Sequence, residues 1–179
     1  MLFRPLRTED LPVLHGWLSR PHIVEWFGEP PTLVEVERDY LPSIAGNVPH
    51  HCYFAIEAGT PVGFIQSYTP AGWHHEGWWL EEHDPGVRGI DQFVADAGRL
   101  GQGLGTRMVR SFVAQLFEDQ SVTRVQTDPS PENRRAIRCY EKADFRAVKE
   151  IETPDGRALL MYCDRNRSEK TEDRYQPIP

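Results

Sequence analysis

The sequence is poor in cysteine and contains no long hydrophobic run. Its three cysteines, Cys52, Cys139 and Cys163, are an odd number, lie far apart and include no Cys-x-x-Cys pair, which argues against structural disulfides and a zinc site. No stretch approaches the ~20 apolar residues that a membrane span requires, and the first residues lack the apolar core of a signal peptide. We therefore expect a cytoplasmic protein that crosses no membrane.

Histidine pairs at metal-ligand spacing are missing as well. His50, His51, His74, His75 and His83 have no partners at helical ligand spacing, so we interpret them as loop residues and expect no metal. A role for His74 or His75 in proton transfer stays open.

Positive charge is scarce. There are 20 Lys and Arg against 27 Asp and Glu, which gives a formal net charge of -7. A nucleic-acid binder needs a basic surface that releases counterions from phosphates, so this class is excluded. An acidic surface attracts cationic ligands, although it also serves solubility, and charge alone does not separate these two interpretations.

The N-terminal half is predicted to contain strands and helices in alternation. A strand over 2–6 precedes a helix over 8–18 with Thr8 as its N-cap. Thr32 is predicted to cap a second helix, whose apolar face carries Leu33, Val36, Tyr40 and Leu41 and which Pro42 ends or kinks. Strands over 52–58 and 62–68 follow as a hairpin.

The segment 69–88 has no period and holds Trp73, Trp78 and Trp79 among histidines and acidic residues. Loops of this length in a small domain are more often functional than not, although a surface excursion folded on its own tryptophans remains the alternative.

The C-terminal half predicts a strand over 89–94, a glycine cluster, a helix reaching Phe117 and a strand over 122–127. A further helix with Ala136, Ile137 and Tyr140 and two closing strands over 145–151 and 158–163 complete the pattern. The size and the 39% hydrophobic content fit one domain. From 164 onward the chain is polar without a period, which predicts a tail over 165–179.

A glycine cluster between strand and helix gives the first chemical signal. Glycines let the backbone approach an anion closely, and the following helix N-terminus offers unpaired N–H groups, so a phosphate is the expected ligand. An ordinary tight turn is the alternative, since a glycine cluster alone is weak. The candidate residues are Gly101, Gln102, Gly103, Leu104, Gly105 and Thr106.

The segment Asn133 to Phe145 resembles the Asn-x-x-Ala-x-x-x-Tyr-x-x-x-Gly-Phe signature of the GCN5-related N-acetyltransferase (GNAT) superfamily. The resemblance implies an α/β (α+β) fold with a single mixed, mostly antiparallel sheet of about six to seven strands and about four helices, over residues 1–164. It implies that the glycine loop binds the diphosphate of acetyl-CoA, that Asn133 touches the pantetheine arm and that Tyr140 protonates the departing thiolate.

Two positions depart from the family pattern. Leu100 stands where Gln or Arg is usual, which matters little if that position contributes its backbone N–H. Asp144 stands where Gly is usual, and Asp tolerates the left-handed backbone conformation better than most residues.

Longer segments, among them 22–26, 77–79, 84–92 and 126–131, resemble the aminoglycoside 6′-N-acetyltransferases. That resemblance implies an aminoglycoside substrate, antibiotic resistance, and substrate contacts from Trp26, Glu76, Asp91 and Asp128.

The expected mechanism is direct attack of the substrate amine on the acetyl thioester. Asp91 and Glu76 hold the amine and accept its proton, directly or through water. A backbone N–H near Phe93 or Val94 polarises the carbonyl, and Tyr140 donates a proton to sulfur. The protein is expected to be a monomer or a homodimer.

Each of these residues also has a structural interpretation. Tyr140 alone would read as a buried aromatic, Asp91 could pair with Arg88, and Asp128 could cap the following helix. Two other functions stay open: acetyl transfer to a polyamine or a protein N-terminus, and a non-catalytic sensor of acyl-CoA.

Overall fold

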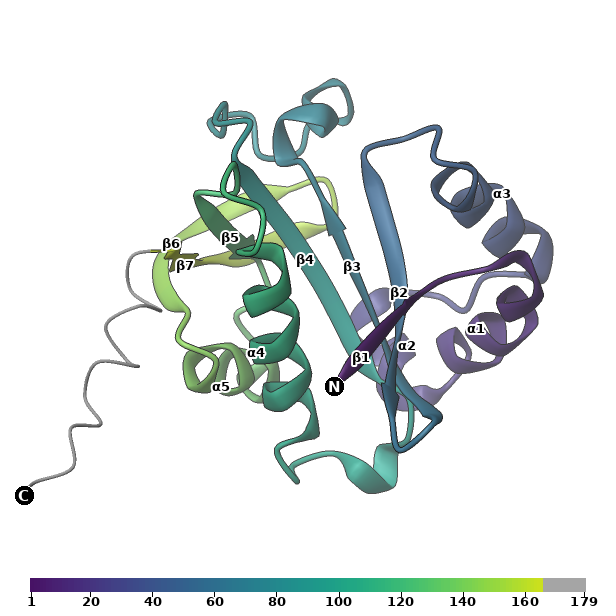
Figure 1. Cartoon of the computed structure of the whole chain (residues 1–179). Coiled ribbons are helices and arrows are strands. Elements are labelled where there is room, and N and C mark those ends of the chain that lie inside the picture. Colours follow the sequence, from purple (N-terminus) through teal and green to yellow (C-terminus); the bar gives the residue numbers. More distant parts are fainter. Residues whose placement is uncertain (166–179) are drawn as a thin grey trace, which may run out of the picture.

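The computed structural model describes residues 1–165 and places a seven-stranded sheet between two layers of helices (Figure 1). The strands are β1 (Leu2–Pro5), β2 (His50–Glu57), β3 (Thr60–Tyr68), β4 (Val87–Val94), β5 (Arg124–Thr127), β6 (Arg146–Thr153) and β7 (Gly156–Asp164). Their order in the sheet is β1-β2-β3-β4-β5-β7-β6, and β4 with β5 is the parallel pair while the other neighbours are antiparallel. The predicted mixed, mostly antiparallel sheet is confirmed.

Helices cover both faces of this sheet (Figure 1). One layer is α4 (Leu104–Leu116) with α5 (Arg134–Lys142), and the other is α1 (Leu11–Leu18), α2 (Pro21–Phe27) and α3 (Leu33–Ile44). Short 3-10 helices are η1 (Thr8–Asp10), η2 (Pro70–Glu76) and η3 (Ala97–Arg99). The helix α2 was not predicted from the sequence, because seven residues with one buried side chain, Ile23, carry too little periodicity. No helix within residues 1–165 is long and apolar enough to cross a membrane.

Side chains alternate between the two layers along each strand. Ile65 and Ile90 pack in one buried cluster with residues of α4 and α5, whereas Phe64 and Phe93 pack in a second with residues of α1 to α3. This alternation is the period of two that a doubly covered strand imposes.

Two helix starts differ in how well the sequence predicted them. Thr32 caps α3 as expected, because its hydroxyl accepts from the N–H of Glu35 and the Glu35 carboxylate accepts from the N–H of Thr32 at 2.7 Å. The prediction for Thr8 is wrong: Thr8 begins η1, and α1 follows from Asp10, whose carboxylate instead accepts two 2.8 Å bonds from Arg4.

Other expectations need smaller corrections. Pro42 lies inside α3, which continues to Ile44, and Leu33 and Leu41 remain exposed while Val36 is buried. His50 and His51 lie in β2 rather than in a loop, because that strand begins two residues before its first apolar residue. The hairpin turn is Ala58-Gly59, with both residues at positive φ. The predicted tail over 165–179 lies outside the described residues except for Arg165.

The parallel contact between β4 and β5 is short. It pairs Val87 to Gly89 with residues 124–126, and β4 then runs five residues further to Val94 with β3 alone beside it. The sheet is therefore open on one side of the C-terminal half of β4, next to the N-terminal ends of α4 and α5.

Candidate active site

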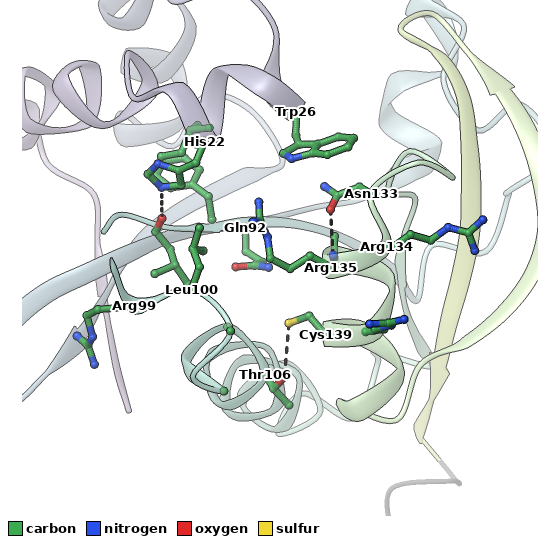
Figure 2. Close-up of a pocket in the computed structure, with 18 of the residues that line it drawn as sticks. His22, Trp26, Gln92, Arg99, Leu100, Thr106, Asn133, Arg134, Arg135 and Cys139 are labelled. Carbon is green, nitrogen blue, oxygen red and sulfur yellow. Dashed lines mark hydrogen bonds between the residues drawn. The ribbon is translucent and has the colours of Figure 1, made fainter. Parts of the chain in front are cut away.

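A cavity of about 500 Å³ lies where β4 leaves β5. Its walls come from α2, the C-terminal half of β4, the loop before α4 and the side of α5 (Figure 2). Of the residues predicted to bind the coenzyme, those that line it are Phe93, Val94, Gly101, Gly103, Gly105, Thr106 and Asn133.

The glycine loop has the geometry of an anion cradle. Gly101 and Gly103 have φ values of 73° and 77°, and Gly103 is the N-cap of α4. A Cβ on Gly105 would come within 3.2 Å of the Cys139 Sγ atom, so the glycine allows α4 and α5 to approach each other. The unpaired N–H groups of the first turn of α4 therefore face the cavity without side chains in the way.

Two predicted coenzyme residues lie elsewhere. Leu104 is buried in the core beneath α4. The Gln102 side chain turns back and donates to the Gly98 carbonyl at 2.6 Å. Any contact of these two residues with a ligand would therefore come from their backbone.

The open edge of β4 supplies backbone polar groups. The N–H of Ala95 donates to Val62 in β3, and in an antiparallel pair alternate residues point their N–H and C=O groups away from the partner strand. Val94 therefore directs its N–H away from β3. Its carbonyl oxygen lies 3.1 Å from the Nε2 of His22 on α2 (Figure 2).

Two buried polar atoms at the cavity have no protein partner within residues 1–165. They are the Oε1 of Gln92 and the Nε1 of Trp26, and both side chains line the cavity (Figure 2). Buried polar groups normally find partners. Such atoms fit a ligand that carries both donors and acceptors, as an amide-containing arm does.

The charge of the cavity is opposite to that of the chain. No carboxylate lines it, whereas five cations do: Arg99, Arg134, Arg135, Arg138 and Lys142. None of these five residues was predicted to belong to the site, although four of them lie inside the Asn133 to Phe145 segment. The negative net charge of the chain gave no sign of a cationic patch, because a whole-chain value averages over local patches.

Asn133 begins α5. Its Oδ1 accepts from the N–H of Ala136 at 3.0 Å (Figure 2), which fixes the side chain at the rim of the cavity. The interpretation of Asp128 as the cap of this helix is therefore wrong. Five residues, including two prolines, separate Asp128 from the first residue of α5, and the last of them, Asn133, occupies the capping position.

Tyr140 is buried in the core on α5, with 4% of its surface exposed, and is not one of the residues that line the cavity. Burial raises the pKa of its hydroxyl above the ordinary value, which a hydrogen bond with Thr127 partly opposes. The negative charges of Asp91 and Asp128 raise this pKa further. The hydroxyl is consequently protonated at neutral pH and faces an acidic neighbourhood.

Asp91, inside β4, and Asp128, directly after the end of β5, form a pair of partly buried carboxylates. Desolvation raises the pKa of both, and repulsion from Asp91 helps to raise that of Asp128 to about 7. Asp91 accepts from the Gln66 amide at 2.9 Å, and Asp128 accepts from the Trp79 indole N–H at 2.9 Å. Arg88 does not neutralise Asp91; its guanidinium donates to the carbonyls of Pro85 and Val87.

The other predicted substrate residues are more dispersed. Trp26 lines the cavity from α2. Glu76, at the end of η2, is about half exposed, and its carboxylate lies 3.5 Å from His75. Besides Asp91, the carboxylate of the described chain whose charge raises the pKa of Asp128 is Asp155, which was not among the predicted site residues.

The site therefore has two ends of opposite sign. The cationic cavity suits an anionic ligand held by its phosphates, and the carboxylate pair suits a cationic one. Tyr140 lies on α5, the helix that carries four of the five cations, and the charges of Asp91 and Asp128 raise its pKa. Within residues 1–165 no group of His, Cys, Asp and Glu could hold a metal ion.

Comparison with known proteins gives one family model, described as an acetyltransferase (GNAT) domain, which matches residues 7–153. The chain is 50% identical over 171 residues to aminoglycoside N(6′)-acetyltransferase type 1 of Klebsiella pneumoniae, covering 94% of this chain and 85% of that protein. It is 58% identical over 94 residues to a kanamycin resistance protein of Rhizobium radiobacter, covering 52% of this chain and 87% of that one.

Among solved structures, the fold matches the crystal structure of aminoglycoside acetyltransferase AAC(6′)-Ib in complex with coenzyme A and kanamycin. The TM-score is 0.90 at 50% sequence identity, over 95% of this chain and 98% of that one.

Proposed function

The chain belongs to the aminoglycoside 6′-N-acetyltransferases of the GNAT superfamily, and from that premise we propose that it transfers the acetyl group of acetyl-CoA to the 6′-amine of aminoglycosides and so confers resistance to them. Residues 1–164 form the catalytic domain in this proposal. The enzyme acts in the cytoplasm, where acetyl-CoA is made.

Acetyl-CoA fits the cationic cavity as the donor substrate. The loop 101–106 and the first turn of α4 hold its diphosphate through backbone N–H groups. Its pantetheine arm runs between the open edge of β4 and α5, where the unpartnered Gln92 Oε1 accepts from one of its amides. The N–H of Val94 donates to the thioester carbonyl and stabilises the negative charge that develops on its oxygen.

The carboxylate pair is the observation that carries the acceptor assignment. Asp91 and Asp128 lie partly buried with raised pKa values and with no cation of the described chain among the contacts that shift them. Two such carboxylates are costly unless a cation joins them. A polycationic aminoglycoside supplies that cation, and its binding lowers both pKa values.

Asp91 is the proposed acceptor of the proton that the amine must lose before attack. Gln66 donates to one carboxylate oxygen of Asp91 at 2.9 Å, and Tyr68 makes a further hydrogen bond to this carboxylate. Both bonds fix the carboxylate in place to accept a proton from the amine or from a bridging water. Asp128 holds the substrate beside it. Glu76, exposed on the loop, contributes charge that attracts the polycation and can take the proton through water.

Tyr140 is the proposed general acid. Because its pKa is raised, it carries its proton at neutral pH, which is the state that a donor needs. As the carbon–sulfur bond breaks, the hydroxyl gives this proton to the thiolate of coenzyme A, and the charge does not accumulate on sulfur.

The test offers acetyl-CoA together with kanamycin, spermidine or an N-terminal peptide and measures the free thiol released. We expect turnover with kanamycin and acetylation at the 6′-amine, identified by NMR of the product. Turnover of spermidine or the peptide alone would assign the enzyme to another acceptor, and coenzyme binding without any turnover would indicate a sensor.

A further inference from the structure

Four cations of α5 stand apart from the other basic side chains of the described chain. Within residues 1–165, all other Arg and Lys side chains either pair with a carboxylate or donate to backbone carbonyls. The exceptions, which make neither an ion pair nor a hydrogen bond to that part of the protein, are Arg134, Arg135, Arg138 and Lys142.

Their position is as unusual as their lack of partners. All four are on one helix of nine residues and line one cavity. In a chain with 27 acidic residues, solvent-exposed cations readily find carboxylates, yet no carboxylate lines this wall. A scattered set of solvated arginines would not gather in this way, so the helix is arranged to meet an anion from outside the chain.

The diphosphate of the coenzyme does not account for all of this charge. In the proposed function, on which this inference rests, the glycine loop and the α4 N-terminus hold the diphosphate through backbone N–H groups. Arg99 also lines the cavity beside the loop. Coenzyme A carries one further phosphate, a monoester on the ribose 3′ oxygen, which is largely dianionic at neutral pH and favours a site with cations of its own.

The contacts between α4 and α5 locate the cations that can reach it. Cys139 lies against the first turn of α4, with its Sγ 3.6 Å from the Thr106 hydroxyl (Figure 2). Arg138 and Lys142 are four residues apart on one face of α5 and line the same cavity as the glycine loop, so both are within the part of the site that faces the diphosphate cradle. Figure 2 shows Arg134 and Arg135 leaving the start of α5 in different directions, Arg135 toward Gln92 and Arg134 away from it.

We propose that Arg138 and Lys142 bind the 3′-phosphate of coenzyme A and make the enzyme discriminate between acetyl-CoA and its 3′-dephospho form. Arg138 presents a planar fork that can bind two phosphate oxygens, and Lys142 adds a compact charge four residues later on the same face. The acidic surface elsewhere repels the dianion, which confines it to this wall.

The experiment measures binding of coenzyme A and of 3′-dephospho-coenzyme A by calorimetry, and kcat/KM for both acetylated forms with kanamycin. The variants are Arg138→Gln and Lys142→Gln. The wild type should prefer the 3′-phosphorylated form by roughly 10- to 100-fold, and each variant should lose about 3- to 10-fold of this preference through the phosphorylated form alone. Increasing salt should weaken binding of coenzyme A more steeply than that of the dephospho form.

Arg38→Gln is the charge-matched control. Arg38 is exposed on α3, pairs with Asp39 and lies outside the cavity wall, so this variant should keep the preference. Equal losses for both coenzyme forms in Arg138→Gln and Lys142→Gln would assign these cations to the diphosphate and overturn the inference, as would a wild type without preference. Calorimetry needs no acceptor, so the affinities for the two coenzyme forms can be compared even if kanamycin is not acetylated. A failure of kanamycin turnover would count against the proposed function alone.

Discussion

The Trp79 indole N–H donates to the Asp128 carboxylate across 49 residues of sequence, at 2.9 Å. The same indole stacks on the ring of Tyr68 with centroids 4.9 Å apart, and Tyr68 in turn covers Gly89, where a Cβ would come within 2.1 Å of the Tyr68 ring. The segment 69–88, which has no sequence period, therefore holds one carboxylate of the pair. This hydrogen bond lowers the pKa of Asp128 against the larger effect of burial.

Replacing Trp79 by Phe should raise the pKa of Asp128 further, because the carboxylate loses the donor that favours its charged form. The acidic limb of kcat/KM for aminoglycoside should then move upward by roughly one pH unit. Trp73→Phe is the matched control, since the Trp73 indole N–H bonds to no residue of the described chain. A limb that moves equally in both variants, or in neither, would contradict the role of the hydrogen bond.

Asp128→Asn tests how much the buried carboxylate of Asp128 destabilises the folded protein. The folded pKa of about 7 is above the ordinary 3.8, so the folded chain retains a proton that the unfolded chain releases, and stability falls as pH rises between these values. The Asn variant lacks this loss. Its free energy of unfolding should therefore exceed that of the wild type by on the order of 1–2 kcal/mol at pH 8, after allowance for partial exposure. At pH 4 the two free energies of unfolding should be equal.

Urea unfolding at both pH values measures this difference. The same variant should also lose the pH 7 limb of aminoglycoside kcat/KM. A stability difference that does not change between pH 4 and pH 8 would show that Asp128 titrates at its ordinary pKa.

Tyr140→Phe should lower turnover by about 10- to 1000-fold while the affinity for acetyl-CoA stays nearly unchanged, because the variant loses only the proton donor. The rate of thiol release measures turnover, and calorimetry measures the affinity for acetyl-CoA. Unchanged turnover would show that Tyr140 takes no part in the chemistry. Tyr140 would then be a buried core aromatic, whose ring centroid lies 5.4 Å from that of Phe145.

Asp91→Asn should reduce kcat for kanamycin far more than Glu76→Gln does. Asp91 is partly buried and fixed by Gln66, whereas Glu76 is about half exposed beside His75, where water screens its charge. Steady-state kinetics at pH 7.5 compares them, with coenzyme affinity as the control. A larger loss of kcat in Glu76→Gln would transfer the proton-accepting role to the loop.

Asp144 lies in the left-handed region with φ of 70°, as its place at the family's glycine position predicts. Asp144→Gly should leave stability unchanged or raise it slightly, since the backbone strain disappears and the exposed contact with Arg110 at 3.7 Å adds little. Asp144→Val should destabilise the fold by about 1–2 kcal/mol. Thermal unfolding separates the two, and a neutral valine variant would mean that the turn relaxes.

The strand and helix order of this chain could be predicted because its signals are local. Phe64 and Ile65 alternate between two clusters, Thr32 and Glu35 cap a helix through neighbouring atoms, and Gly103 sits where a left-handed turn starts α4. Each of these depends on residues within a few positions of one another. The exceptions are α2, whose local signal is short, and the Thr8 cap, where a 3-10 turn over Thr8–Asp10 precedes α1.

The sequence by itself determined the alternation of elements, the glycine cradle and the family signature around Tyr140, because short spacings decide backbone conformation and motif alike. Only the tertiary structure decided the electrostatics. It brought Asp91 on β4 close to Asp128 after β5, paired Asp128 with Trp79, and left the α5 cations beside a cavity without a carboxylate. The reason is physical: charge and pKa depend on distance and burial between groups far apart in the chain, and composition averages both away.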